Sequence, residues 1–174
     1  MMIKKAIIFG IAGAKLKKEE IIFFKKNKPW GIILFSRNIK NIHQLKELVS
    51  NIKKIFNDNK YPILIDVEGG NVSRINNIID LKIFSQKFFG DLYTKNKNLF
   101  YVYYKIYINT VCNILKDVGI YINTIPNLDI VRKKSHHIIG SRSFSSKGKK
   151  VSFLGNLCIA LCAKNKIATV MKHI

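Results

Sequence analysis

The sequence predicts an α/β fold, a parallel sheet of five strands in which each strand but the last is followed by helix. Short, continuously apolar runs alternate with longer segments whose apolar residues recur at helical spacing. Such runs, without polar alternation, are typical of parallel strands that crossover helices bury on both faces. Polar, glycine-rich and charged residues gather directly after the runs, where folds of this kind place their functional sites.

The first half of the chain holds three strands and two helices. The basic start, short apolar run and Ala-x-Ala-like end of residues 1–16 resemble a signal peptide. A buried strand over residues 7–11 is favoured instead, because a good helix over residues 17–26 follows it. Residues 30–35 form the second strand. An apolar stripe then predicts a helix over residues 42–56, and a third strand over 62–67 includes an acid, Asp66.

The second half continues the alternation. Helical patterns cover residues 83–92 and 99–118, and the second ends at Gly119, a residue that commonly stops helices. After them come a fourth strand, a polar and basic loop, another helix and a fifth strand, at residues 120–125, 127–149, 150–163 and 167–171. No repeat or linker divides the chain, so one domain over residues 1–174 is expected.

Two closures of the sheet are open, a doubly wound sheet and part of a barrel. Five strand–helix units cannot fill an eight-stranded barrel of about 250 residues. No GxGxxG motif follows the first strand, so dinucleotide binding is not expected, and no other cofactor is predicted.

The formal net charge of +21 raises nucleic acid or an anionic membrane as partners. However, the charge comes from 27 Lys and only 4 Arg, and the Lys are scattered over every segment. Proteins that recognise nucleic acid rely heavily on Arg. The pattern indicates a compositional bias toward Lys, Asn and Ile, so specific nucleic-acid binding is not expected. Membrane binding is not expected either, because no segment approaches the ~20 apolar residues that span a bilayer.

The three cysteines, Cys112, Cys158 and Cys162, form no CxxC pair. Cys158 and Cys162 are four residues apart on a predicted helix, which would suit two metal ligands on one face. No further partner stands at metal-ligand spacing, so we expect buried thiols rather than a metal site. A reducing, cytoplasmic location follows from this cysteine usage.

Three of the scarce arginines, Arg37, Arg74 and Arg142, follow predicted strands. Arg suits fixed, planar recognition of oxygen-bearing ligands, but it also braces loops through ion pairs. The sequence leaves both roles open.

The strongest polar cluster spans residues 66–74, at the end of the third strand. Asp66 is expected at the mouth of the sheet, where a carboxylate can accept hydrogen bonds from ligand hydroxyls. Gly69 and Gly70 allow a tight turn and a close approach of the backbone. Asp66 and Glu68 together could be a catalytic pair. The favoured interpretation is that Glu68 supports the site by holding Arg74 or the loop.

Five segments in order resemble glycoside hydrolase family 3, in the branch of bacterial β-N-acetylglucosaminidases of peptidoglycan recycling. They are GIILFSRN at 31–38, ILIDVEGGNVSR at 63–74, GIYINTIPNLDI at 119–130, IIGSRSF at 138–144 and ATVMKHI at 168–174. The resemblance covers essentially the whole chain. It implies a partial (β/α)8 TIM barrel, about the first five βα units. It also implies retaining hydrolysis of terminal β-linked N-acetylglucosamine from a glycan or muropeptide.

Matching residue by residue, the resemblance implies that five side chains bind the sugar: Asp66, Arg74, Arg142, Lys172 and His173. Glu68, Gly69, Gly70 and Asp129 are expected to support them. Val67 and Asn71 depart from the usual pattern of the family, and these changes are expected to weaken the site without abolishing it.

In the family, the acid/base histidine and the nucleophilic aspartate follow the Lys-His pair, and neither matches a residue present here. The expectation is therefore an incomplete domain that is inactive by itself. The alternative is a non-catalytic sugar-binding or interaction module. His136 and His137 are expected at the surface, and unpaired strand edges are expected to favour self-association.

Overall fold

The structure, a computed structural model, describes residues 4–132 and 139–173. Its strands are β1 (Lys5–Phe9), β2 (Pro29–Leu34), β3 (Ile63–Ile65), β4 (Val67–Gly69), β5 (Val72–Ser73), β6 (Ile122–Asn123) and β7 (Ala168–Thr169). Its α-helices are α1 (Lys18–Asn27), α2 (Ile42–Phe56), α3 (Gln86–Lys95), α4 (Lys97–Asp117) and α5 (Gly148–Lys164). Two short 3₁₀ helices are η1 (Ser36–Asn38) and η2 (Gly140–Arg142).

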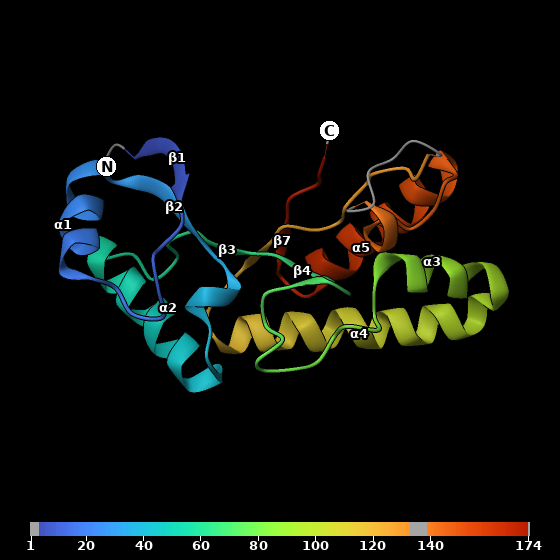
Figure 1. Cartoon of the computed structure of the whole chain (residues 1–174), viewed down its shortest axis with the longest axis horizontal. Coiled ribbons are helices and arrows are strands. Elements are labelled where there is room, and N and C mark those ends of the chain that lie inside the picture. Colours follow the sequence, from blue (N-terminus) through green and yellow to red (C-terminus); the bar gives the residue numbers. More distant parts are fainter. Residues whose placement is uncertain (1–3, 133–138, 174) are drawn as a thin grey trace.

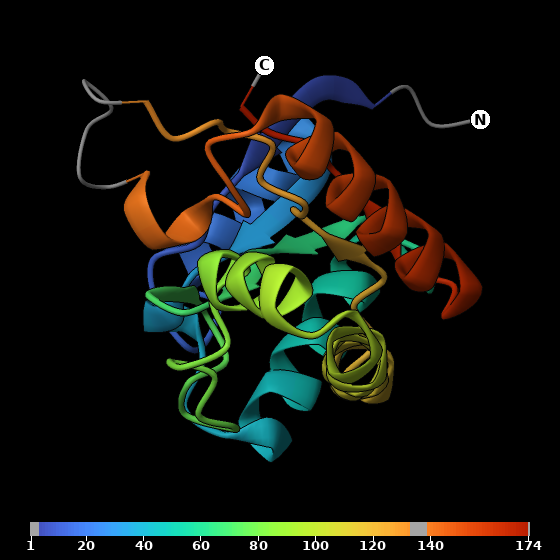
Figure 2. The same ribbon diagram turned by 90° about the vertical axis from the view of Figure 1, so that its right-hand side faces the viewer.

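Five strands form one parallel sheet in the order β1-β2-β3-β6-β7, which is also their order along the chain (Figure 1). A doubly wound sheet reverses its strand order at a switch point, whereas a barrel adds each strand beside the previous one. The sequential order therefore decides for part of a barrel. Figure 2 shows α2, α4 and α5 arranged around one side of the strands.

Helix α2 has the bounds that its apolar stripe predicts. Its buried face carries Leu45, Leu48, Val49, Ile52 and Phe56. The Asn41 side chain accepts a hydrogen bond from the backbone N–H of Gln44, and Asn57 ends the helix in the left-handed conformation. Local capping and burial of one face thus agree, which is why the sequence fixes this element so well.

The two outer strands are less buried than expected. A buried first strand at residues 7–11 was wrong, because the strand runs over Lys5–Phe9 and leaves Ile7 and Ile8 exposed by 42% and 41%. At the other edge, the predicted strand 167–171 shortens to β7, and Val170 and Met171 are exposed. Within the described chain each has only one neighbouring strand, so an apolar run alone does not bury it.

Helices α3 and α5 both pack against α4 (Figures 1 and 2). Gly90 of α3 lies against the loop between η2 and α5, because a Cβ there would lie 1.8 Å from the Phe144 carbonyl oxygen. Cys112, Cys158 and Cys162 lie buried as free thiols in this region, as the sequence predicts. In the described part of the chain, none of the helices is both long and apolar enough to cross a membrane.

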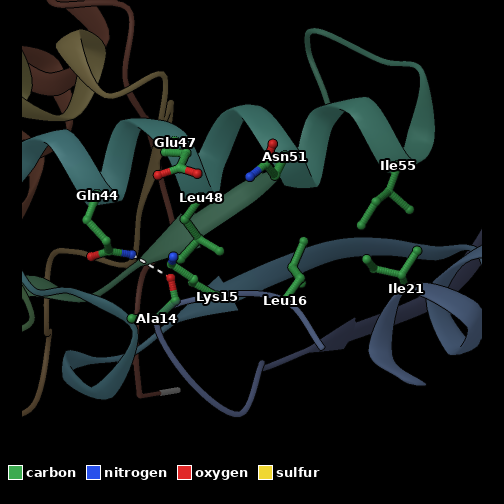
Figure 3. Close-up of a pocket in the computed structure, with 9 residues that line it drawn as sticks. All are labelled: Ala14, Lys15, Leu16, Ile21, Gln44, Glu47, Leu48, Asn51 and Ile55. Atoms are coloured by element: carbon green, nitrogen blue, oxygen red, sulfur yellow. Dashed lines mark hydrogen bonds between the residues drawn. The ribbon is translucent and has the colours of Figure 1, made fainter. Parts of the chain in front are cut away.

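The loop between β1 and α1 is tied to α2. Figure 3 shows Gln44 reaching from α2 to the carbonyl of Ala14, to which its Nε2 donates a hydrogen bond of 2.7 Å. Lys15 and Leu16 continue along the same groove (Figure 3). This contact holds the residues that follow β1 in place at the end of the sheet.

Candidate functional site

The site lies where β3, β6 and β7 end. Asp66 follows β3 directly, and the chain then makes the β4–β5 hairpin and returns, so that the Arg74 backbone N–H donates to the Asp66 carbonyl at 3.0 Å. The side chain of Asn123, at the end of β6, bonds both backbone groups of Val67, at 2.9 and 3.2 Å. Both contacts fix the direction in which Asp66 leaves the sheet.

Lys172 lies at the centre of the site. Its Nζ is 2.7 Å from Asp66 Oδ1 and 2.7 Å from Glu68 Oε1, and it donates to Thr124 Oγ1 at 3.1 Å. Backbone hydrogen bonds join Lys172 to Pro126 and Leu128, which holds the segment after β7 beside the segment after β6. One ammonium thereby joins side chains from three strand ends.

Glu68 is almost completely buried, with 1% of its side chain exposed. It accepts two parallel hydrogen bonds from Arg142, each of 2.9 Å, and is paired with Lys172 as well. Glu68 was expected to hold Arg74 or the loop, and its partners in the structure are Arg142 and Lys172 rather than Arg74. Arg74 instead pairs with Asp66, Nη2 to Oδ2 at 3.4 Å, because the hairpin returns it to the base of Asp66.

His173 and Asp129 form a second, outer pair. His173 Nδ1 lies 2.9 Å from Asp129 Oδ2, and 53% of the His173 side chain is exposed. The structure thus brings four of the five predicted sugar-binding residues, Asp66, Arg74, Arg142 and Lys172, into one ion-pair network with Glu68. It places the fifth, His173, next in the chain to Lys172 and leaves it accessible.

Gly69 and Gly70 form the tight turn of the hairpin. Their φ angles are +84° and +60°, which side chains with a Cβ rarely adopt. A Cβ on Gly69 would lie 2.1 Å from the Phe84 carbonyl oxygen, and one on Gly70 would lie 2.8 Å from Ser85 Cβ. The two glycines therefore allow the segment just before α3 to pass directly against the turn of the hairpin.

Sequence reasoning missed Asn123 and Thr124. Thr124 donates a short hydrogen bond to Asp66 Oδ1 and accepts one from Lys172. The signal was available, because Asn123 and Thr124 are a polar pair at the end of an otherwise apolar strand. The same rule selected Asp66.

The electrostatics of the network shift the pKa values of two of its groups, Asp66 and Arg142. Burial alone would raise the pKa of Asp66. Hydrogen bonds from Lys172 and Thr124, with the positive charges of Lys172 and Arg74, outweigh it and hold that pKa below its ordinary value. The hydrogen bonds with Glu68 raise the pKa of Arg142 although burial opposes them. Both shifts favour the charged forms of Asp66 and Arg142.

Acid is expected to weaken the fold through Asp66. A carboxyl whose pKa is lower in the folded chain than in the unfolded one, about 3.9, stabilises above that unfolded value and loses its contribution as pH falls through the folded pKa. Urea denaturation between pH 3 and pH 7 should therefore show that the free energy of unfolding falls below about pH 4. This decrease should be smaller in Asp66→Asn than in the wild type. Asp117→Asn serves as a control, because Asp117 is exposed, and it should show the same decrease in the free energy of unfolding at acid pH as the wild type. If Asp66→Asn showed the same decrease below about pH 4 as the wild type, the prediction would be contradicted.

Among the residues that the structure describes, no group of three or more His, Cys, Asp or Glu side chains is placed so that it could hold a metal ion. The expectation for His136 and His137 lies outside the described residues. What the site offers is a carboxylate acceptor at Asp66, held by the donors Lys172 and Arg74, with the exposed His173 next in the chain to Lys172. Such a set binds neutral molecules rich in hydroxyl groups through charge-assisted hydrogen bonds.

Comparison with known proteins places this geometry in a family. Residues 4–174 match the glycosyl hydrolase family 3 N-terminal domain. The chain is 26% identical over 147 residues to beta-hexosaminidase A of Pseudoalteromonas piscicida, a match that covers 82% of this chain and 24% of that protein.

Two solved structures of NagZ from Neisseria gonorrhoeae have the same fold. The structure in complex with zinc ion has a TM-score of 0.87 and 28% identity, covering 98% of this chain and 51% of that one. The structure in complex with N-trifluoroacetyl-D-glucosamine has a TM-score of 0.86 and 27% identity, with the same coverage. The chain thus spans about half the length of these structures and about a quarter of the hexosaminidase. Because the domain match runs over nearly the whole sequence, this chain belongs to glycosyl hydrolase family 3.

Proposed function

We propose that this chain forms the sugar-binding part of a β-N-acetylhexosaminidase and that Asp66, Arg74, Arg142, Lys172 and His173 hold a terminal N-acetylglucosamine. The curated relative is named a beta-hexosaminidase, and one structural neighbour was solved with an N-acylated glucosamine bound. In the family such binding precedes retaining hydrolysis of the glycosidic bond.

One observation carries the proposal: Asp66 is held by three donors and still has 13% of its side chain exposed. A carboxylate fixed in this way can accept a sugar hydroxyl without losing rotational freedom, which keeps the entropic cost of binding low. Arg74 and His173 are more exposed and would donate to other ring substituents. Arg142 commits Nε and Nη2 to Glu68, which leaves Nη1 for a sugar oxygen.

The described site offers no free carboxyl group for hydrolysis. A retaining mechanism needs a nucleophile and a proton donor at the scissile bond. Each acid of the described site, Asp66, Glu68 and Asp129, is already paired with a cation or with His173. We propose that the chain binds sugar without cleaving it, which is also how a non-catalytic sugar-binding module would behave. We further propose that the chain acts in the cytoplasm, in peptidoglycan recycling, and that its ligand is a glycan or muropeptide.

Binding of N-acetylglucosamine to the purified chain, measured by isothermal titration calorimetry, tests the proposal. Asp66→Ala and Arg142→Ala each remove a charge-assisted hydrogen bond of about 1.5–3 kcal/mol, so affinity should fall about 10- to 150-fold. Asp117→Ala, in an exposed ion pair, is the matched control and should bind like wild type. Absence of saturable binding in the wild type would refute the proposal. Turnover of a chromogenic N-acetylglucosaminide would refute the inactivity of the isolated chain.

We also propose that the chain associates with itself through its outer strands. Strand β1 exposes Ile7 and Ile8, and an exposed apolar edge is a template for pairing with another chain. Sedimentation velocity should show association that grows with concentration and weakens in Ile8→Glu. The control is Ile22→Glu, since Ile22 is 68% exposed but lies on α1. Equal effects of both variants would remove the strand edge as the cause.

A further inference from the structure

Two buried side-chain amides, those of Gln86 and Asn127, are in contact with each other. Gln86 is the first residue of α3 and is 6% exposed, and Asn127, in the segment after β6, is 0% exposed. The Nε2 of Gln86 donates to the backbone carbonyl of Asn127 at 3.2 Å. This contact anchors the segment after β6 to the start of α3.

Each amide has one atom without a hydrogen-bond partner among the described residues, Oε1 of Gln86 and Nδ2 of Asn127. A buried polar atom without a partner costs free energy, and apolar side chains of similar shape are often as stable in such places. Packing therefore does not explain why amides stand at these two positions. The groups that they do bind indicate their role.

Asn127 shapes the turn that carries Asp129. Its Oδ1 accepts a hydrogen bond of 2.8 Å from the backbone N–H of Asp129, two residues further along, which is the bond of an Asx turn. The backbone carbonyl of Asp129 accepts a hydrogen bond from the Ser143 hydroxyl. Both backbone groups of Asp129 are thus held, and its carboxylate starts from a fixed backbone.

Asp129 in turn holds His173, with 2.9 Å between Oδ2 and Nδ1. The His173 side chain is 53% exposed, so packing alone leaves its ring room to rotate. Asn127 also pairs with Lys172 in a parallel bridge. The segment that Gln86 anchors is therefore the one beside which Lys172 and His173 lie.

We propose that Gln86 and Asn127 are positioning residues for sugar binding, which fix Asp129 and, through it, the ring of His173. The inference rests on the proposed function, in which His173 contacts the sugar. A ring that is oriented before binding loses less rotational freedom when it forms a hydrogen bond to a ligand, so the affinity is higher. Neither amide contacts the ligand, and both act through residues 127–129.

Two substitutions at one position separate positioning from packing. Asn127→Leu keeps nearly the same shape but removes the acceptor of the Asp129 N–H. Asn127→Ser leaves a small void but keeps an oxygen that can accept from the N–H two residues further along. Asn127→Leu should therefore melt at a higher temperature than Asn127→Ser and yet bind N-acetylglucosamine more weakly. By isothermal titration calorimetry its affinity should fall about three- to tenfold from wild type, the effect of one neutral hydrogen bond.

The loss of affinity in Asn127→Leu should act through His173. In the background of His173→Ala, Asn127→Leu should change the affinity by less than about twofold, whereas independent effects would add. Carbon-13 relaxation of the His173 ring, measured without sugar, should show a rigid ring in the wild type and faster reorientation in Asn127→Leu. Gln86→Met removes the anchor of the Asn127 carbonyl and should produce both effects in smaller measure.

Gln44→Met is the matched control for Gln86→Met, because Gln44 also holds a loop carbonyl from the first turn of a helix (Figure 3). Its partners are the carbonyls of Ala14 and Asn38 rather than the segment after β6. The affinity and the motion of the His173 ring should therefore match those of the wild type. Circular dichroism melts check that each variant is folded.

Affinities that follow the melting temperatures, with Asn127→Ser binding more weakly than Asn127→Leu, would overturn the inference. So would a His173 ring whose motion is the same in wild type and Asn127→Leu. If the wild type binds N-acetylglucosamine and Asn127→Leu binds it equally well, the inference alone fails. If the wild type does not bind this sugar, the proposed function fails, and the ring measurements still decide whether the two amides position His173.

Discussion

Glu68→Gln is expected to lower the free energy of unfolding by about 3–5 kcal/mol, the range for breaking a buried ion pair by removing one partner. Only 1% of the Glu68 side chain is exposed, and it faces two cations, Arg142 and Lys172. The neutral amide keeps the size of the side chain but removes its charge. Its NH₂ group would also point at a donor. Arg142 would then stay partly buried without a counter-charge.

Urea denaturation of wild type and variant measures this loss. Glu47→Gln is the matched control, because it makes the same change at an exposed position of α2 and should cost less than about 0.5 kcal/mol. The double variant Glu68→Gln/Arg142→Met should recover part of the loss, since it removes the orphaned charge as well. A loss below about 1 kcal/mol in the single variant would mean that water or another group replaces Glu68.

Gly69→Ala is expected to destabilise the chain by about 3 kcal/mol or more, through two costs that add. The φ of +84° is unfavourable for alanine, by about 1–3 kcal/mol. The new Cβ would also lie 2.1 Å from the Phe84 carbonyl oxygen and 2.7 Å from the Tyr107 hydroxyl. The first of these atoms is backbone, so the hairpin has to move, and Glu68 moves with it.

Gly69→Ala should therefore have a lower melting temperature and a lower affinity for N-acetylglucosamine than the wild type. Gly13→Ala is the matched control, since its Cβ would have no neighbour within 4 Å and its φ is not in the left-handed region. It should stay within about 0.5 kcal/mol of wild type. Similar melting temperatures for the two variants would show that the hairpin accommodates a side chain at position 69.

Local sequence patterns were sufficient to predict most of the helices and strands of the fold. Helix α2 has its predicted bounds, because its apolar stripe and its Asn41 cap depend only on neighbouring residues. The ends of the strands also indicated which residues meet in the ion-pair network, since Asp66 and Lys172 both follow strands. The same rule, applied to Asn123 and Thr124, would have completed the network. The lengths of three strands, β3, β6 and β7, were overestimated, because an apolar run continues beyond the last residue that finds a pairing partner.

The sequence by itself determined the α/β class, the order of strands and helices, and the polar residues that meet at the ends of the strands. Periodicity and the direction of parallel strands are properties of short segments, so one sequence suffices to read them. Only the tertiary structure decided the order of the strands within the sheet, the exposure of β1 and β7, and the partner of each charged side chain. Lys172 and Asp66 are 106 residues apart, and Arg142 and Glu68 are 74 apart. Which carboxylate meets which cation depends on how the strand ends are placed in space, and no local spacing encodes that placement.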